Sequence, residues 1–324
     1  MSKSAFVTII GRPSVGKSTL LNKMCGEKVA IVSRVPQTTR NAIRGIVNGK
    51  EGQLVFVDTP GRHSSEKKIN KKLMEVSERS LSDSDLVLYV IDASRAPGAE
   101  EEEIAKLLAP LAEKTIAAVN KMDIPGADFN RAKEFISLFL NIPNSFPVSS
   151  VISVPPCDEI SIPGVFPVSA DTGEGIEALL SALFAMAPEG QPLYDSEYYT
   201  DQETGFRISE IIREQAINRL RQELPHSLYV DIADMEFKET GSQNSSRSEV
   251  PRGELWVRAF IIVERESQKG MVVGKGGEMI KAIRLASLKE LKKIFDWKID
   301  LDLRVKTGKD WRHNDYTLKR IIER

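Results

Sequence analysis

The stretch "GRPSVGKST" at residues 11–19 decides the fold. It fits the pattern G-x-x-x-x-G-K-[ST], a loop whose backbone N–H groups surround a phosphate. The apolar run "AFVTIIG" (5–11) predicts a buried strand that leads into this loop, and "STLLNKMCG" (18–26) predicts a helix that ends at Gly26. A phosphate held there would lie at a helix N-terminus, where the backbone favours anions. The order strand, loop, helix therefore predicts a nucleoside triphosphate site.

The residue types of this loop suit that chemistry. Gly11 and Gly16 allow the backbone to approach the phosphates closely. Lys17 would reach the β- and γ-phosphates, and Ser18 would bind Mg²⁺. The predicted nucleotide contacts of the loop are Gly11, Arg12, Pro13, Ser14, Val15, Gly16, Lys17, Ser18 and Thr19.

Three more runs rich in β-branched and apolar residues follow, "QLVFVDTPG" (53–61), "DLVLYVIDA" (85–93) and "TIAAVNKMD" (115–123). Stretches with helical spacing separate them. Strands that alternate with helices predict an α/β domain with a mostly parallel sheet and helices on both faces. Ligands of such sheets bind at the carboxyl ends of the strands, which is where the polar motifs of these runs fall.

"DTPG" at 58–61 ends the second of these strands. Asp58 would hold Mg²⁺ through water, the Gly61 N–H would face the γ-phosphate, and Thr59 and Pro60 complete the predicted contacts. The alternative is a plain β-turn, since Pro-Gly forms turns in many settings. Its place directly after a hydrophobic strand favours the nucleotide site.

"NKMD" at 120–123 predicts the base. The Asp123 carboxylate can accept hydrogen bonds from N1–H and the 2-amino group of guanine, whereas adenine has no 2-amino group. Asn120 and Lys121 would brace the loop and the ring. A buried polar group left unpaired costs enough free energy for strong discrimination, so guanine is the predicted base.

The last nucleotide loop should be Ser-Ala, with the alanine N–H facing guanine O6. Two stretches compete for it, "FPVSS" (146–150) and "FPVSA" (166–170). We predict Ser169 and Ala170, because "DTGEGIEALLSALFAMA" follows and supplies a closing helix.

The second glycine loop, "GKGG" at 274–277, lacks the spacing of a phosphate loop. We predict helices on both sides of it, within the order helix (206–223), strand (227–237), strand (254–265), helix, loop, helix (277–295) and strand (298–306). A Gly-x-x-Gly turn between two helices is typical of KH modules, which clamp the backbone of single-stranded nucleic acid. The alternative is an ordinary helix–helix turn. The predicted RNA contacts are Gly274, Lys275, Gly276, Gly277, Lys281 and Arg284.

The charge pattern agrees with an anionic partner for this last part. Residues 269–324 hold 15 Lys and Arg against 8 Asp and Glu, whereas 191–268 hold 9 against 15, although the whole chain has a net charge of −1. Beside the loop, Met271, Val272, Met279 and Ile283 could either floor a base groove or belong to the core.

These motifs in this order, followed by the "GKGG" module, resemble the Era family of GTPases. The resemblance covers nearly all 324 residues, leaving out mainly 143–164 and 239–252. It implies a P-loop GTPase domain at 1–187, a linker at 188–201 and a smaller α+β type II KH domain at 202–324. "PQTTR" (36–40) is similar to the switch I of the family.

The resemblance also implies the active residues and ligands. Thr39, with Thr38 as the alternative, would close over Mg²⁺, so the metal set is Ser18, Thr39 and Asp58, and the catalytic set is Lys17, Thr39 and Gly61. The cofactors would be GTP or GDP and Mg²⁺. Switch I would span about 33–45 and switch II about 61–80.

Partners follow from the same resemblance: the 3′ end of small-subunit ribosomal RNA and the small ribosomal subunit, whose maturation the protein would assist. The expected protein is a cytoplasmic monomer, and a weak peripheral association with the inner face of the cell membrane stays open. Two cysteines far apart, Cys25 and Cys157, fit a reduced interior, and no apolar run has the length of a membrane span.

Two departures from the family pattern bear on hydrolysis. Arg62 follows "DTPG" where Ras-like enzymes carry a water-orienting Gln, so intrinsic hydrolysis should be slow; Arg62 and His63 fit solvated switch residues better than catalytic ones. Ser14 stands where potassium-activated relatives carry Asn, so we expect no potassium activation.

Two other functions compete with this expectation. One is an RNA-binding assembly factor that uses GTP only as a ligand. The other is a related GTPase that acts on tRNA or the large subunit, which the Gly-x-x-Gly module disfavours.

Overall fold

The computed structural model describes residues 2–33, 35–36, 38–61, 68–140, 142, 146–147, 161–162, 164–221, 224–239 and 253–322. The chain divides into two compact units, the first formed by Met1–Val32 with Pro36–Asp201 and the second mainly by Gln202–Arg324. None of the helices in the described ranges is long and apolar enough to cross a membrane.

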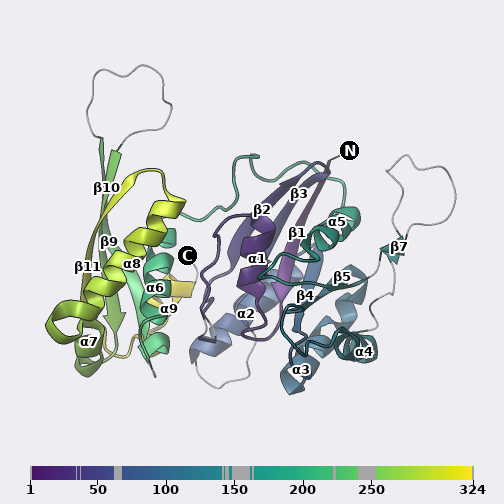
Figure 1. Cartoon of the computed structure of the whole chain (residues 1–324), viewed down its shortest axis with the longest axis horizontal. Coiled ribbons are helices and arrows are strands. Elements are labelled where there is room, and N and C mark those ends of the chain that lie inside the picture. The colour runs from purple at the N-terminus through teal and green to yellow at the C-terminus, as the bar shows by residue number, and fades with distance from the viewer. Residues whose placement is uncertain are drawn as a thin grey trace, which may run out of the picture. The chain divides into compact units, whose positions relative to one another are not determined.

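The first unit is an α/β domain, as the sequence predicts (Figure 1). Its main strands and helices are β1 (Lys3–Ile10), α1 (Lys17–Cys25), β2 (Ile43–Gly49), β3 (Gly52–Asp58), α2 (Lys68–Ser82), β4 (Leu86–Asp92), α3 (Ala99–Leu108), β5 (Thr115–Asn120), α4 (Phe129–Phe139), β8 (Val165–Pro167) and α5 (Ile176–Met186). A separate pair, β6 (Phe146–Pro147) and β7 (Ser161–Ile162), is antiparallel.

The six-stranded sheet of this unit has the order β2-β3-β1-β4-β5-β8. All neighbours run parallel except β2 and β3, which form an antiparallel hairpin. Helices cover both faces (Figure 1), so the central strands are buried on both sides, and every residue of β4 and of β5 is buried. The order of strands in the sheet therefore places the carboxyl ends of β1, β4 and β5 side by side.

The second unit is a smaller α+β domain. Its elements are α6 (Thr204–Ile217), β9 (Leu228–Glu239), β10 (Gly253–Val263), α7 (Glu266–Val273), α8 (Glu278–Ile294), β11 (Lys298–Thr307) and α9 (Asp315–Ile322). The three strands have the order β11-β10-β9, with β10 parallel to β11 and antiparallel to β9. The helices and strands follow one another in the order that the sequence predicts for the type II KH domain.

The core of the second unit follows from two periodicities. Along β10 alternate residues such as Leu255, Val257 and Ala259 are buried, which gives the sheet one covered face. In α8 the buried positions Ile283 and Leu291 lie on one stripe, eight residues apart. Helices α6 and α8 contact each other, α6 packs on β9, and α8 packs on β11 (Figure 1).

Predicted and observed boundaries differ most for α6, which ends at Ile217 and not near 223. Its last turn tightens, because Arg219 N donates to Ala216 O at 3.1 Å, and Pro225 in the following 3₁₀ turn has no N–H to continue a helix.

Candidate functional site

The phosphate loop joins β1 to α1 and passes close to other backbone segments. Gly16 has a φ of 98°, and a Cβ added at Gly11 would lie 2.4 Å from the carbonyl oxygen of Val90. Only glycine fits such approaches without displacing backbone. Ser14 is also left-handed, with a φ of 65°, although it carries a side chain.

Lys17 lies folded back over this loop. Its Nζ donates to the carbonyl oxygens of Gly11 at 2.9 Å and Arg12 at 3.1 Å, and the side chain is buried. Burial lowers the pKa of Lys17 to about 8, an effect that the charge of Asp58 opposes. The ammonium is therefore retained at neutral pH, and phosphate oxygens could replace the two carbonyls as its acceptors.

Three side-chain oxygens converge beside Lys17. The Ser18 hydroxyl donates to Asp58 Oδ2 at 2.6 Å and lies 3.0 Å from the Thr39 hydroxyl, which also reaches Asp58 Oδ2 at 3.3 Å. They come from α1, the segment before β2 and the end of β3. The predicted metal set Ser18, Thr39 and Asp58 is thus brought together in one place.

This oxygen set fits a magnesium ion. Hydroxyl and carboxylate oxygens are the hard ligands that Mg²⁺ takes, together with water and substrate phosphates. Asp58 is fully buried, and its Oδ1 has no hydrogen-bond partner within the described part of the protein. No group of three or more His, Cys, Asp or Glu exists there that could hold a metal ion. A divalent ion at this place would therefore depend on hydroxyls, water and a bound phosphate.

The loop after Asp58 packs against the phosphate loop. The Thr59 hydroxyl donates to Ile9 O at 2.8 Å, and Ser77 of α2 donates to Pro60 O at 3.1 Å. A Cβ added at Gly61 would lie 2.8 Å from Pro13 Cα, so glycine is required for this contact. These contacts place the Gly61 backbone beside the phosphates' expected position.

Asn120, the last residue of β5, holds two loops at the other end of the site. Its side chain is buried, Nδ2 donates to Val15 O at 2.8 Å, and Oδ1 accepts from Ala170 N at 2.9 Å. The amide thus braces the phosphate loop and the Ser-Ala loop against β5. The Ala170 N–H, which the sequence predicts to face guanine O6, donates to Asn120 Oδ1 in this structure.

Asp123 is oriented by the Ser-Ala loop. The Ser169 hydroxyl donates to Asp123 Oδ1 at 2.6 Å and accepts from Thr172 N at 3.1 Å. One carboxylate oxygen is therefore fixed by serine, and the carboxylate has further lone pairs to accept from a base. The competing Ser149 and Ser150 lie outside the described residues.

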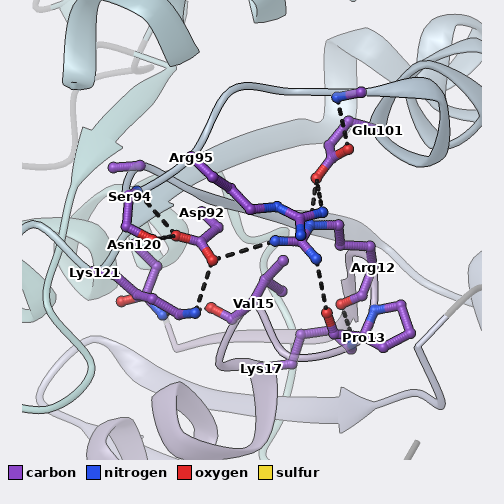
Figure 2. Close-up of polar contacts among 12 residues, drawn as sticks. Arg12, Pro13, Val15, Lys17, Asp92, Ser94, Arg95, Glu101, Asn120 and Lys121 are labelled. Carbon is purple, nitrogen blue, oxygen red and sulfur yellow. Dashed lines mark hydrogen bonds and ion pairs between the residues drawn. The ribbon is translucent and has the colours of Figure 1, made fainter. Parts of the chain in front are cut away.

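Sequence reasoning missed a buried network of charges behind the phosphate loop (Figure 2). The Arg12 side chain turns away from the loop interior to pair with Asp92 at 3.3 Å and with Glu101. Asp92 also pairs with Lys121 at 2.7 Å. The Arg12 carbonyl oxygen accepts from Lys17. The Arg12 guanidinium contacts the two carboxylates and also donates to Pro13 O at 3.3 Å. The available signal was Asp92 itself, a carboxylate at the end of an apolar strand.

The linker predicted at 188–201 is fastened to the edge of the sheet. Gln53 of β3 accepts from Leu193 N and Tyr194 N at 2.8 and 2.9 Å, and Ile46 N of β2 donates to Tyr199 O at 2.9 Å. The bond from Ile46 satisfies a backbone group of β2, the edge strand, which would otherwise be left open.

The end of the linker reaches the residues that follow Thr39. The Thr200 hydroxyl donates to Arg44 O at 2.8 Å, and the Arg44 guanidinium pairs with Asp201 at 2.7 Å. Since Arg44 lies in β2, the linker is bonded to the strand that continues the predicted switch I.

In the second unit the "GKGG" turn joins α7 to α8. Gly274, Gly276 and Gly277 all have left-handed φ values of 75°, 60° and 81°. A Cβ at Gly274 would collide with Met279, whereas Gly276 and Gly277 have no atom within 4 Å of an added Cβ. The latter two therefore present backbone to open space, next to the exposed Lys275.

The other two predicted RNA contacts, Lys281 and Arg284, differ in exposure and in bonding. Lys281 is exposed, whereas Arg284 donates to Leu301 O at 2.5 Å and pairs with Asp300 at 3.3 Å, which holds it against β11. Among the apolar candidates, Val272 and Ile283 are fully buried and belong to the core, and Met271 is 55% exposed. Arg62, His63 and most of 143–164 and 239–252 lie outside the described residues.

Comparisons with known proteins agree with this geometry. A family model described as "50S ribosome-binding GTPase" matches residues 6–121, and one described as "KH domain" matches residues 223–312. The chain is 49% identical to GTPase Era of Treponema denticola, over 98% of this chain and 99% of that protein. It is 40% identical to GTPase Era of Borreliella burgdorferi, over 99% of both.

The chain belongs to the Era family of GTPases. Among solved structures, it is similar to an Aquifex aeolicus Era variant bound to GDP and AlF4⁻, with a TM-score of 0.83 at 30% identity and 98% coverage of both chains. It is also similar to Era in complex with MgGDPNP and nucleotides 1506–1542 of 16S ribosomal RNA, with a TM-score of 0.84, 31% identity and the same coverage. The protein is thus a GTPase that uses GTP and Mg²⁺ and carries a C-terminal KH domain, as its sequence predicts.

Proposed function

We propose that this Era-family GTPase is a switch that binds the 3′ end of small-subunit ribosomal RNA and assists maturation of the small ribosomal subunit. The observation that carries the proposal is the convergence of Ser18, Thr39 and Asp58 beside Lys17, in a chain that also presents the open "GKGG" turn. The similar Era structure that holds a 16S RNA fragment supports the class of RNA.

In the nucleotide site, Lys17 would neutralise the β- and γ-phosphates, while backbone N–H groups between Gly11 and Thr19, other than at Pro13, and that of Gly61 would surround them. Ser18, Thr39 and Asp58 are the residues that would hold Mg²⁺, the last through water. The ion would supply positive charge for the phosphate oxygens. Thr59 and Pro60 fix the Asp58 loop.

For the base, Asp123 accepts from N1–H and the 2-amino group of guanine. Ser169 fixes this carboxylate, Asn120 braces the pocket, and Lys121 lies beside the ring. The Ser169–Ala170 loop lines the O6 edge. Hydrolysis should be intrinsically slow, since Arg62 follows "DTPG" where Ras-like enzymes carry a water-orienting Gln.

In the KH domain, the backbone of an RNA strand lies against Gly276 and Gly277, where the absence of side chains leaves room for phosphates. Lys275 and Lys281 are exposed and supply the charge that attracts the strand. Arg284 contributes by holding α8 to β11, and its charge lies near the same end of the helix.

Coupling between nucleotide and RNA runs through the chain itself. When GTP and Mg²⁺ hold Thr39, the segment leading into β2 is fixed. Arg44 of β2 is bonded to Thr200 and Asp201, directly before Gln202, where the second unit begins. Ordering of switch I therefore acts on the linker at the point where it enters the RNA-binding domain.

The decisive test of the RNA site is the double variant Lys275→Asp with Gly276→Asp. Carboxylates there repel phosphates and occupy the open space, so affinity for a single-stranded 3′-terminal small-subunit RNA should fall by several kcal/mol. Lys292→Asp with Lys289→Ala is the matched control. It changes the net charge by the same amount, but about 20 Å along α8 from the turn.

Affinity is measured by RNA titration at fixed salt, with circular dichroism as a check on folding and GTP titration as a check on the first unit. Large-subunit ribosomal RNA serves as the competing ligand. Equal RNA affinity in the two double variants, or tighter binding of the large-subunit RNA, would contradict the proposal. The cytoplasmic location, the monomeric state and a weak membrane association stay predictions, which cell fractionation and gel filtration test.

A further inference from the structure

Asp92 connects the phosphate loop to the guanine loop. It is the last residue of β4, the strand between β1 and β5, so its side chain lies between the loops that follow those two strands. Asp92 Oδ2 accepts from Lys121 Nζ at 2.7 Å and from the Arg12 guanidinium at 3.3 Å (Figure 2). Its Oδ1 accepts from the backbone N–H and the hydroxyl of Ser94 at 2.9 and 2.6 Å. All its contacts therefore fix one orientation.

The two carboxylates of this network, Asp92 and Glu101, pair with different cations. Glu101 of α3 pairs with Arg12 and with Arg95, while its other oxygen accepts from Gly98 N at 2.9 Å. Asp92 alone pairs with Lys121 among the ion pairs of the described residues. Loss of the Asp92 charge would leave Lys121 without a counter-charge, whereas loss of the Glu101 charge would not.

Lys121 depends on such a partner for its position. Its backbone is left-handed, with a φ of 67°, which is unfavourable for a residue with a side chain. The turn is closed by Ile124 N, which donates to Lys121 O at 3.1 Å, but the long side chain is held at its tip by Asp92. Because Asp92 holds the tip of the lysine, the aliphatic part of the side chain is already ordered before a nucleotide binds. Nucleotide binding then costs less side-chain conformational entropy.

We propose that Asp92 is a positioning residue for guanine nucleotides: it holds the Lys121 side chain beside the base and, through Arg12, joins the base pocket to the phosphate loop. Asp92 does not touch the nucleotide. The inference rests on the proposed place of Lys121 beside the guanine ring.

Asp92 carries its negative charge at neutral pH. Burial by itself raises the pKa of this carboxyl group, but hydrogen bonds from Lys121 and Ser94 outweigh burial, and the pKa is lowered below its ordinary value. Asp92→Asn therefore removes one charge while keeping nearly the same shape.

The test compares Asp92→Asn with Glu101→Gln in the full-length protein. Both variants remove a buried carboxylate that pairs with Arg12, and only the first removes the partner of Lys121. Affinity is measured by titration with a fluorescent GDP analogue, and thermal stability is measured without nucleotide. We expect Asp92→Asn to weaken GDP binding about tenfold and Glu101→Gln to weaken it no more than about threefold, while both lower the melting temperature.

A second arm removes the other end of the ion pair. Lys121→Met keeps the aliphatic stem and removes the ammonium group. This variant should also lose about tenfold in GDP affinity, and adding Asp92→Asn to it should change the affinity by less than about twofold, because the two residues act as a pair. The Lys121→Met arm keeps the inference testable even where Asp92→Asn fails to fold.

Different results would contradict the role of Asp92 and the proposed base pocket. GDP affinity of Asp92→Asn or of Lys121→Met within about twofold of wild type would overturn the inference. Equal losses in Asp92→Asn and Glu101→Gln would also overturn it, because they would assign the network to stability alone. Failure of the wild-type protein to prefer GDP over ADP would contradict the proposed base pocket itself, which is a different result.

Discussion

The hydroxyl oxygens of Ser18 and Thr39 lie 3.0 Å apart, and both lie within hydrogen-bonding distance of the same Asp58 oxygen. Ser18 follows the phosphate loop, and Thr39 precedes β2 by a few residues, so this contact joins the predicted switch I to the metal position. The shared acceptor means that a cation at this point would draw on all three residues together.

Thr39→Ala should slow GTP hydrolysis about a hundredfold, because one oxygen that stabilises the charge of the reacting phosphate through the metal is lost. GDP affinity should change little, since GDP has no γ-phosphate for switch I to close on. Single-turnover hydrolysis and GDP titration measure the two effects. Thr38→Ala is the matched control. A larger loss of hydrolysis rate in Thr38→Ala than in Thr39→Ala would show that Thr38 is the metal ligand.

Asp123→Asn should convert the preference from GTP toward XTP. The amide can donate to the 2-oxygen of xanthine, but it clashes electrostatically with the 2-amino group of guanine. Asp128→Asn makes the same charge change at the N-cap of α4, where asparagine is an equally good cap. Competition titrations with GTP and XTP on both variants measure the selectivity. Wild-type GTP affinity in Asp123→Asn would show that this carboxylate does not contact the base.

GDP affinity should fall as the pH rises through about 8. Burial lowers the pKa of Lys17 to about 8 in the free protein, and a bound phosphate raises it again. Nucleotide binding therefore takes up a proton above that pH, and the affinity present below it is lost progressively as the pH increases. Titration of GDP at several pH values, without Mg²⁺, measures this slope. In Lys17→Met the GDP affinity should no longer depend on pH in this range. The same pH dependence in the variant and the wild type would show that another group titrates.

Hydrolysis should run at similar rates in potassium and sodium buffers, because Ser14 is shorter than the asparagine expected of potassium-activated relatives. Ser14→Asn should introduce a potassium response. The variant should fold, since Ser14 has a left-handed φ of 65° that asparagine adopts more readily than most residues. Rates in matched chloride salts test both statements. Strong potassium activation of the wild-type protein would mean that serine or backbone oxygens already hold the ion.

The order of motifs predicted both the α/β fold and the loops that meet in the site. This worked because parallel strands place their carboxyl ends together, so "GRPSVGKST", "DTPG" and "NKMD" had to fall at one edge of the sheet. The α+β fold of the second half was likewise predictable from the alternation of β10 and the helices around "GKGG".

Side-chain partners distant in sequence were not predictable. Arg12 was assigned to the nucleotide by its place in the loop, yet two buried carboxylates far along the chain attract its guanidinium. Arg284 similarly bonds to β11, which its helical position could not indicate. The polar composition of 188–201 predicted a linker, but composition cannot show that Gln53 and Ile46 bond to it.

The most direct measurement of the central claim is the affinity for 3′-terminal small-subunit RNA in the presence of a non-hydrolysable GTP analogue and of GDP. If switch I acts on the RNA-binding domain through Arg44 and the linker, the wild-type protein should bind RNA at least about fivefold more tightly with the GTP analogue. In Thr39→Ala the two affinities should become nearly equal. Equal RNA affinities with both nucleotides in the wild-type protein would contradict the account.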